Sequence, residues 1–423
     1  MCLFNRYDNT LICPYCFEEF SSDKVHFRAS SKSPLPKVPD SLLNDWRKSF
    51  EMDPLGDDGV VINPLTDKVT ESQPETFVTP DGKKRKLLTE IRDKHGVPTT
   101  TRLCPHCHNV LPKHYGKGES KVLAVLGDTY SGKTVYIIAL IDWLRENFHT
   151  YFTDGYAAVC VGEKQYLENK AQLDAMNSGG MASTMPKFQE PYIIEILYKK
   201  KALYLSIFDF PGEADQKRFE DVFIRQATKA DGLLLTYDLC RSRTFKAAVI
   251  SYYSKLIEAI PSDSNQRALL KKAELEIIKT KIETKGSEFD SWTTSILGNC
   301  VSTRQKRPCA VVWTKSDVIR SLTYAEEFPY ELQALKDDIR VKFGGTQLDT
   351  SNLMSRQHTL LLDMLRMKDG GIINMLQSAN YNFDAMHFAV SSLGGDLGAG
   401  HDNRESINIE NPILWLMRKF RFI

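Results

Sequence analysis

A glycine-rich segment that begins at residue 127 carries a pattern suited to binding a polyphosphate. Its residues are Gly127, Asp128, Thr129, Tyr130, Ser131, Gly132, Lys133 and Thr134. They match G-x-x-x-x-G-K-[ST] and lie between an apolar run at 121–126 and an apolar, helix-forming run at 135–144. Backbone N–H groups of such a loop surround the phosphates, Lys133 adds a positive charge, and Thr134 places its hydroxyl on Mg²⁺. The alternative, a glycine turn without a ligand, fits this strand–loop–helix setting poorly.

A candidate Mg²⁺ ligand follows the apolar run at 202–208, which ends in Asp209-Phe210-Pro211-Gly212. A carboxylate at the carboxyl end of a strand beside the cradle can hold Mg²⁺ through water, and the N–H of Gly212 can reach a γ-phosphate. An ordinary turn is the alternative for a D-x-x-G pattern alone. Its place at the end of this strand favours the Mg²⁺ interpretation.

Two further residues could act on an attacking water or sense the γ-phosphate. Glu213 could orient or deprotonate water, or it could be an exposed residue of a switch segment, and both interpretations remain open. Thr184, in the stretch 179–186, is the candidate for a second Mg²⁺ ligand, and a loop threonine without a ligand is the alternative. The catalytic candidates are Lys133, Thr184, Gly212 and Glu213.

A third pattern suits recognition of a guanine base. The apolar run at 309–313 ends in T-K-S-D, in which a carboxylate at Asp317 can accept from the guanine ring N–H and exocyclic amine. The stem of Lys315 can pack over the base, and adenine lacks the matching donors, so discrimination could reach about 10⁴. The run 386–390 leads to small residues whose N–H groups could contact guanine O6, with a plain turn as the alternative. The residues predicted to bind the base are Thr314, Lys315, Asp317, Ser391, Ser392 and Leu393.

Four of the nine cysteines form two C-P-x-C pairs, Cys13 with Cys16 and Cys104 with Cys107. In a reducing compartment this arrangement favours metal binding over disulfides, and two such pairs suit one tetrahedral Zn²⁺. His106 and His108 flank the second pair and could replace a cysteine. A redox-active pair is the alternative, but neither pair has a βαβ context. We expect a zinc ribbon with a structural role, and contact with nucleic acid is the minority interpretation.

The elements that would position these residues are apolar strands separated by helical stretches. The expected strands are 121–126, 191–199, 202–209, 232–237, 308–313 and 386–390. Only a short lysine turn joins the second and third, so these two must be antiparallel. The pattern predicts a three-layer α/β fold with a mixed, mostly parallel six-stranded sheet.

Composition changes along the chain predict two regions. Residues 1–118 hold both cysteine pairs and form the zinc ribbon, split by a long proline-rich insertion at 31–101. Residues 119–423 form the nucleotide-binding domain, with a helical insertion at about 241–306 and a C-terminal helix. Apolar residues recur at helical spacing within that insertion.

The overall charge excludes a strong general attraction to polyanions, because 55 Lys and Arg balance 54 Asp and Glu. The longest apolar runs fall short of the roughly 20 residues that span a bilayer. The N-terminus lacks a charged region followed by an apolar core. We therefore expect a cytoplasmic protein without membrane association, and we do not expect it to bind nucleic acid.

The four motifs occur in one order on the expected strand ends, so residues 121 to about 395 resemble the TRAFAC-class P-loop GTPases, which include Ras-like and translation GTPases. With the leading zinc ribbon and the trailing helix at 411–416, the chain resembles the bacterial "double-GTPase" families of conflict and defence systems. The resemblance implies GTP or GDP, Mg²⁺ and Zn²⁺ as ligands, and a GTP-hydrolysing regulatory switch within a multi-protein system. It also implies protein partners, either an effector or an activating protein.

Several residues depart from the Ras-like pattern. Thr129 and Tyr130 stand where glycines are usual, Glu213 replaces a glutamine, and Thr314 replaces an asparagine. These departures imply slow hydrolysis unless a partner assists. A nucleotide-bound scaffold that scarcely turns over is one alternative, and an ATPase or nucleotide kinase is another. The main hypothesis requires Asp317 and Lys133 to grip opposite ends of one nucleotide, and it fails if they lie on separate faces.

Overall fold

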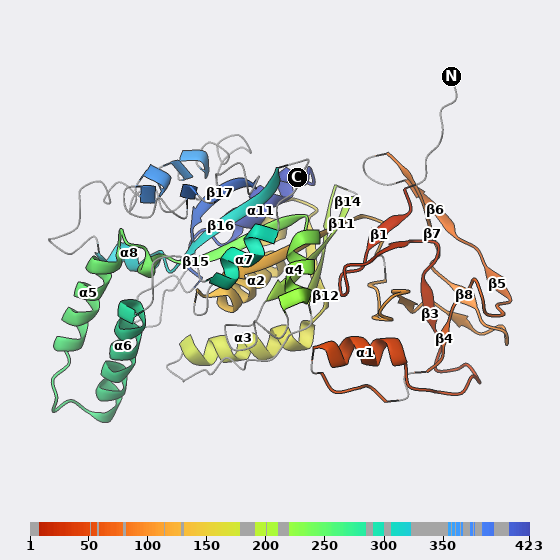
Figure 1. The fold of residues 1–423 in the computed structure, drawn as a ribbon, viewed down its shortest axis with the longest axis horizontal. Helices are drawn as coiled ribbons and strands as arrows, with labels where there is room; N and C mark the ends of the chain where they lie inside the picture. The colour runs from red at the N-terminus through yellow and green to blue at the C-terminus, as the bar shows by residue number, and fades with distance from the viewer. Residues whose placement is uncertain are drawn as a thin grey trace, which may run out of the picture.

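The computed structural model describes most of the chain. The described residues are 8–50, 52–56, 59–78, 82–113, 115–127, 131–177, 191–199, 201–209, 220–284, 291–299, 306–322, 383–392 and 406–423, with short pieces between 354 and 376. Figure 1 shows a central sheet with helices around it, the cysteine-bearing region at one end and a helical hairpin at the other.

The central sheet has seven strands, mixed in direction and mostly parallel. In spatial order they are β12 (Tyr156–Val161), β13 (Tyr192–Tyr198), β14 (Lys201–Asp209), β11 (Glu119–Gly127), β15 (Gly232–Asp238), β16 (Arg307–Thr314) and β17 (Phe383–Ala389). The strands from β14 to β17 in this order pair in parallel, whereas β12 and β13 pair antiparallel. The predicted antiparallel hairpin is confirmed, since Tyr198 lies opposite Lys201 across its turn.

The expected count of six strands was one too low, because β12 was missed. This strand is at the edge of the sheet, and Ala157 is its one fully buried residue. A short edge strand with so little buried apolar surface gives a weak alternation signal. The strand is followed by α3 (Glu163–Asn177), which is fastened to the preceding helix α2 (Lys133–Tyr151) by the ion pair of Lys170 with Asp142 at 2.7 Å.

Helices cover both faces of the sheet and produce three layers. On β11, Leu123 and Val125 belong to the apolar cluster that includes α2 and α11 (Glu410–Lys419). The intervening residues Val122, Ala124 and Leu126 belong to the cluster on the opposite face. That face is covered by α4 (Glu220–Lys229), α5 (Lys246–Glu258) and α7 (Ser291–Asn299). Period-2 alternation along one buried strand thus serves two separate cores.

The described residues of the segment predicted as a helical insertion form three helices with different surroundings. Helices α5 and α6 (Gln266–Thr284) pack on each other and extend from the body of the molecule as a hairpin (Figure 1). Helix α7 instead packs on α4, where Ile296 and Leu297 are fully buried. The described portion of the chain has no helix that is both long and apolar enough to cross a bilayer.

The N-terminal region is built from short strands and one helix. Its strands are β1 (Thr10–Ile12), β2 (Glu19–Ser21), β3 (His26–Arg28), β4 (Val61–Ile62), β5 (Glu71–Ser72), β6 (Glu75–Val78), β7 (Lys84–Leu87), β8 (Ile91–Arg92), β9 (Pro98–Thr99) and β10 (Arg102–Leu103). The helix α1 (Ser41–Ser49) begins after Asp40, whose carboxylate accepts from the Leu43 N–H. The strands β6 and β7 pair antiparallel, with Val78 opposite Lys84.

The N-terminal region contacts the helix that follows the D-x-x-G segment. At the C-terminal end of α4, the ammonium of Lys229 donates to the carbonyl oxygen of Phe17 at 3.0 Å. The same ammonium lies 3.4 Å from the carboxylate of Glu18, and Arg225 lies 3.7 Å from its other oxygen. Phe17 and Glu18 directly follow Cys16, so the first cysteine pair lies beside α4.

Candidate functional site

Two of the motifs predicted to bind one nucleotide touch each other at the carboxyl edge of the sheet. The hydroxyl of Thr314, at the end of β16, lies 2.6 Å from the carbonyl oxygen of Ser131 in the glycine-rich loop. It lies 3.1 Å from the carbonyl oxygen of Tyr237 on β15 and can donate to one of the two at a time. Asp317 begins α8 (Asp317–Leu322) three residues later and is partly exposed. The segments that contain Lys133 and Asp317 therefore lie on one face of the molecule.

The described part of the loop has the backbone geometry that a phosphate cradle requires. Gly127 approaches β15 so closely that a Cβ atom there would lie 2.3 Å from the carbonyl oxygen of Thr236. Gly132 has a φ of 82°, a left-handed conformation that glycine adopts without strain, and α2 begins at Lys133. The first N–H groups of α2 therefore lie at the end of this loop.

Lys133 lies folded over the glycine-rich loop. Its ammonium donates to the carbonyl oxygen of Gly127 at 2.5 Å, and the residue is 8% exposed. This contact holds the positive charge over the loop, where a polyphosphate would accept the same protons. Thr134, the next residue, is half-buried.

A chain of hydroxyl contacts fastens the loop to the neighbouring strand. The hydroxyls of Ser131 and Thr236 lie 2.9 Å apart, and the Thr236 hydroxyl also donates to the carbonyl oxygen of Leu126 at 3.1 Å. Both side chains are fully buried. Thr236 was not among the predicted site residues, although a lone polar residue after the apolar run Leu233–Leu235 was a usable signal.

The two segments predicted to contact the base are joined by backbone hydrogen bonds. The N–H of Ser316 donates to Val390 at 3.1 Å, and the N–H of Val390 donates to Trp313 at 2.8 Å. Ser391 is buried and exchanges two backbone bonds with Ile407, while Ser392 is half-buried. The turn at 314–317 and the end of β17 are thus neighbours, as recognition of one base requires.

Lys315 is held by Asp238, which was not among the predicted site residues. Its ammonium lies 2.5 Å from a carboxylate oxygen of Asp238, the last residue of β15. Burial alone would lower the pKa of the Lys315 ammonium, but the Asp238 carboxylate outweighs it, and this pKa lies above its ordinary value. The other Asp238 oxygen accepts from the N–H of Cys240 at 3.0 Å and begins the short helix η2 (Leu239–Arg241).

Several predicted site residues lie outside the described residues. They are Asp128, Thr129, Tyr130, Thr184, Gly212, Glu213 and Leu393. The backbone of Asp209 ends β14, and its register partner on β11 is Val125, two residues before Gly127. The strand end that carries this candidate Mg²⁺ ligand is therefore beside the strand that enters the cradle.

The four paired cysteines converge in the N-terminal region. Their sulfur atoms all lie within 4.8 Å of one another, with Cys13 and Cys107 at 3.7 Å and Cys16 and Cys104 at 3.8 Å. A tetrahedral Zn²⁺ with Zn–S bonds of about 2.3 Å requires sulfur separations of about 3.8 Å. Burial and the neighbouring thiols raise the pKa of Cys13, so several thiolates here would need a cation. The donor set and its spacing fit zinc.

The two cysteine pairs have the same local backbone geometry. In the first, the N–H groups of Tyr15 and Cys16 point at the Cys13 sulfur at 3.4 and 3.5 Å. In the second, the N–H of His106 points at the Cys104 sulfur at 3.4 Å. The residues after the pairs, Phe17 and His108, both have left-handed φ angles, 61° and 53°. Backbone donors aimed at sulfur stabilise thiolate character in each pair.

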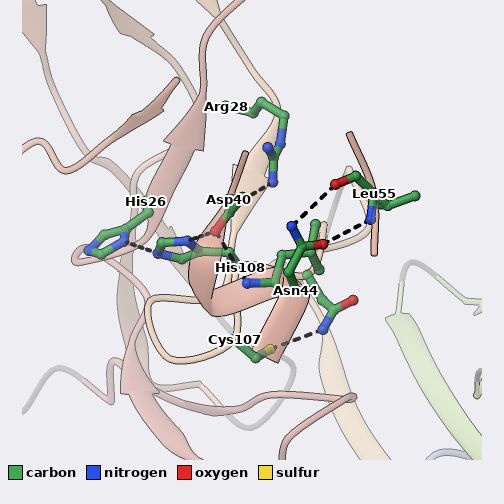
Figure 2. A network of polar contacts seen from close by, with 9 residues as sticks. His26, Arg28, Asp40, Asn44, Leu55, Cys107 and His108 are labelled. Carbon is green, nitrogen blue, oxygen red and sulfur yellow. Dashed lines mark hydrogen bonds and ion pairs between the residues drawn. The ribbon is translucent and has the colours of Figure 1, made fainter. Parts of the chain in front are cut away.

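Neither histidine beside the second pair contributes to the thiol cluster. Figure 2 shows the His108 ring between two other side chains, with the carboxylate of Asp40 at 2.8 Å and the ring of His26 at 3.0 Å. Arg28 forms an ion pair with the second oxygen of Asp40 at 2.8 Å. The ring of His106 bonds instead to the carbonyl oxygen of Glu19 at 3.1 Å. The His108 network fastens the start of α1 to the second cysteine pair.

Comparison with known proteins gives limited similarity. No protein-family model matches the chain, and no curated protein matches it. Among solved structures it is similar to the bacterial selenocysteine-specific elongation factor EF-Sec, with 14% identity, 71% of this chain and 29% of that chain covered, and a TM-score of 0.28.

Two further solved structures show similarity of the same kind. One is a GTP-binding protein from Sulfolobus solfataricus in complex with GDP, with 12% identity, 71% of this chain and 53% of that chain covered, and a TM-score of 0.25. The other is the S. cerevisiae Ski7 GTPase-like domain bound to GTP, with 12% identity, 72% and 51% covered, and a TM-score of 0.33. The chain spans at most about half of each of these three chains. TM-scores this low carry no functional argument.

Proposed function

We propose that this chain is a Mg²⁺-dependent GTP-binding protein of the TRAFAC class that hydrolyses GTP as a regulatory switch. The observation that carries the proposal is the 2.6 Å contact between the Thr314 hydroxyl and the Ser131 carbonyl. It fastens the segment suited to guanine against the segment suited to phosphates. The order of the parallel strands β14, β11, β15, β16 and β17 supports the proposal, because it brings all the motif-bearing strand ends to one edge.

The predicted site residues have distinct roles in this proposal. Lys133 and the first N–H groups of α2 hold the phosphates, and release of the Lys133 ammonium from Gly127 accompanies binding. Asp317 would accept from the guanine N–H groups, and the backbone at Ser392 would face its O6, since the N–H of Ser391 already donates to Ile407. Thr134, Thr184 and Asp209 would hold Mg²⁺, which neutralises charge on the phosphates.

Hydrolysis in this proposal depends on Thr184, Gly212 and Glu213, together with a cation supplied by a partner. Two arginines near the motifs in sequence contact other residues. Arg225 lies 3.7 Å from Glu18, and Arg241 is 6% exposed with its guanidinium over the ring of Tyr237. An activating protein that supplied an arginine would accelerate hydrolysis by about 10³ to 10⁵.

The N-terminal region enters the proposal as a zinc ribbon of residues 1–118 that precedes a GTPase domain of residues 119–423. Cys13, Cys16, Cys104 and Cys107 would hold one structural Zn²⁺, and their spacing supports this role. The resemblance to bacterial double-GTPase families, which rests on the leading cysteine pairs and the trailing helix at 411–416, leads us to propose a cytoplasmic protein within a defence or conflict system. Its effector would distinguish the GTP-bound from the GDP-bound state.

Base selectivity tests the binding part of the proposal. We expect fluorescently labelled GTP to bind much more tightly than labelled ATP, and Asp317→Ala to weaken GTP binding on the order of 10²-fold or more without affecting ATP. Asp384→Ala is the matched control, because this strand carboxylate pairs with Lys419 near the start of β17. Equal affinity for both nucleotides, unchanged by Asp317→Ala, would instead support an ATPase or nucleotide kinase.

Phosphate release tests the catalytic part. Under multiple-turnover conditions with Mg²⁺ and GTP, we expect slow release from the purified chain that is abolished by Lys133→Ala. Acceleration by candidate partners would identify the activating protein. Tight GTP binding without phosphate release, alone or with partners, would exclude GTP hydrolysis and support a nucleotide-bound scaffold.

A further inference from the structure

The two oxygens of the Asp238 carboxylate accept from two different donors. One oxygen accepts from the Cys240 N–H and starts η2, and the other pairs with the Lys315 ammonium at 2.5 Å. The Asp238 side chain is 4% exposed, whereas that of Lys315 is 42% exposed. Lys315 therefore reaches inward from an open position to a buried anion. Burying the Asp238 carboxylate without a cationic partner would cost free energy. The ion pair with Lys315 offsets that cost.

The backbone of Lys315 is in a conformation that a lysine rarely adopts. Its φ is 61°, in the left-handed region, between Thr314 and Ser316. Those two neighbours are fixed by Ser131 and by Val390. The ion pair to Asp238 fixes the side chain between them. The turn is thus fastened to the glycine-rich loop, to β15 and to β17, with Lys315 providing the link to β15.

We propose that Asp238 is a positioning residue for guanine recognition, which fixes the Lys315 stem as a preformed surface for the base. The inference rests on the proposed function, since it assumes that the turn at 314–317 contacts the nucleotide. A free lysine stem would lose rotamer freedom when a base packs on it. The ion pair imposes that restriction before the ligand arrives, so the bound state costs less.

A cycle of variants tests whether Asp238 acts through Lys315. Asp238→Asn keeps an acceptor for the Cys240 N–H but removes the charge that holds the ammonium. Lys315→Met keeps an apolar stem and removes the ammonium. For labelled GDP bound to the full chain, we expect Asp238→Asn to raise Kd about tenfold, mainly through faster dissociation. We expect Asp238→Asn to have little further effect in a Lys315→Met background, within about twofold.

A matched control lies at the other end of the same strand. Asp231 directly precedes β15 and pairs with Lys121 at 3.2 Å, with both side chains about a quarter exposed. Asp231→Asn therefore removes a comparable charge pair far from the turn at 314–317, and we expect the GDP dissociation rate to stay at its wild-type value. Circular dichroism and thermal melting establish that each variant is folded.

The outcomes separate this inference from the proposed function. Tight GDP binding by the wild type with unchanged dissociation from Asp238→Asn would overturn the positioning role alone. Losses that multiply in the double variant would overturn it as well, because Asp238 would then act independently of Lys315. If the Asp238→Asn protein does not fold, the Lys315→Met protein supplies the test. Wild-type affinity of Lys315→Met for GDP would then overturn the positioning role. A wild type that binds neither GDP nor GTP would overturn the proposed function itself.

Discussion

The side-chain hydroxyl of Thr314 lies 2.6 Å from the main-chain oxygen of Ser131, although 183 positions separate the two residues in sequence. The contact connects the end of β16 to the loop that follows β11, and these two strands are not neighbours in the sheet because β15 lies between them. The connection therefore crosses the end of one strand. Through this contact the Thr314 hydroxyl can anchor the glycine-rich loop.

Replacement of Thr314 by valine should loosen the nucleotide site without unfolding the sheet. Valine keeps the shape and loses the donor, so the buried Ser131 oxygen loses this hydrogen-bond donor, at a cost of about 1–3 kcal/mol. We expect nucleotide dissociation to accelerate about tenfold, as measured with labelled GDP in a stopped-flow instrument. Thr314→Ser keeps the hydroxyl and should behave like the wild type. Equal rates for the valine and serine variants would show that the hydroxyl does not anchor the loop.

Two glycine substitutions should have opposite effects on stability. A Cβ at position 127 would lie 2.3 Å from the Thr236 carbonyl oxygen, so Gly127→Ala should lower the free energy of unfolding by about 2 kcal/mol or more. Gly298, on α7, has no atom within 4 Å of an added Cβ. Gly298→Ala should raise that free energy by roughly 0.5–1 kcal/mol, because alanine is the better helix former. Thermal melting compares them, and a Gly127→Ala protein as stable as the wild type would contradict the close approach.

Metal removal should affect the N-terminal region first. We expect the purified chain to contain one zinc per molecule, and Cys13→Ser or Cys104→Ser to lose it, because four sulfur ligands hold a structural ion. A strong chelator should release the same metal and expose this region to protease. Cys160→Ser is the control, because this exposed cysteine lies on β12. Full zinc content in the Cys13→Ser chain would exclude the four-thiol site.

His387 should make stability fall as the solution becomes acidic. It is fully buried on β17, its Nδ1 accepts from the Trp313 indole at 2.9 Å, and its Nε2 has no hydrogen-bond partner among the described residues. Burial, reinforced by nearby His358 and Arg366, lowers the pKa of His387 to about 3. In the unfolded chain the same imidazole has an ordinary pKa near 6.5. Between pH 6.5 and pH 3 the unfolded chain therefore binds a proton at this residue that the folded chain does not bind. Stability contributed by neutral His387 is complete above pH 6.5 and declines toward pH 3.

Urea denaturation between pH 7 and pH 5 measures this effect. His387→Gln removes the titrating group, so its free energy of unfolding should fall less steeply, by up to about 1.4 kcal/mol per pH unit below pH 6.5. His149→Gln, at the exposed end of α2, serves as the control and should keep the wild-type slope. Parallel slopes for all three proteins would contradict a neutral buried His387.

The sequence was sufficient wherever a local run of residues carries the information. Apolar runs predicted six of the seven strands in the sheet, and the lysine turn predicted the antiparallel hairpin. The C-P-x-C pairs predicted a four-thiol cluster, since each pair builds its own knuckle from adjacent residues. The glycines at 127 and 132 indicated a backbone with positive φ angles, because few other residues adopt such angles without strain.

Tertiary structure decided which distant residues meet. Thr236 and Asp238 belong to an apolar strand with no ligand motif, and only the parallel register beside Gly127 and Thr314 gives them their partners. The same holds for His108, whose partners Asp40 and His26 come from other segments. Residue types and spacing therefore fixed the local chemistry of this protein. The order of strands in the sheet determined which of those groups lie within hydrogen-bonding distance, because pairing between strands depends on packing across the whole core.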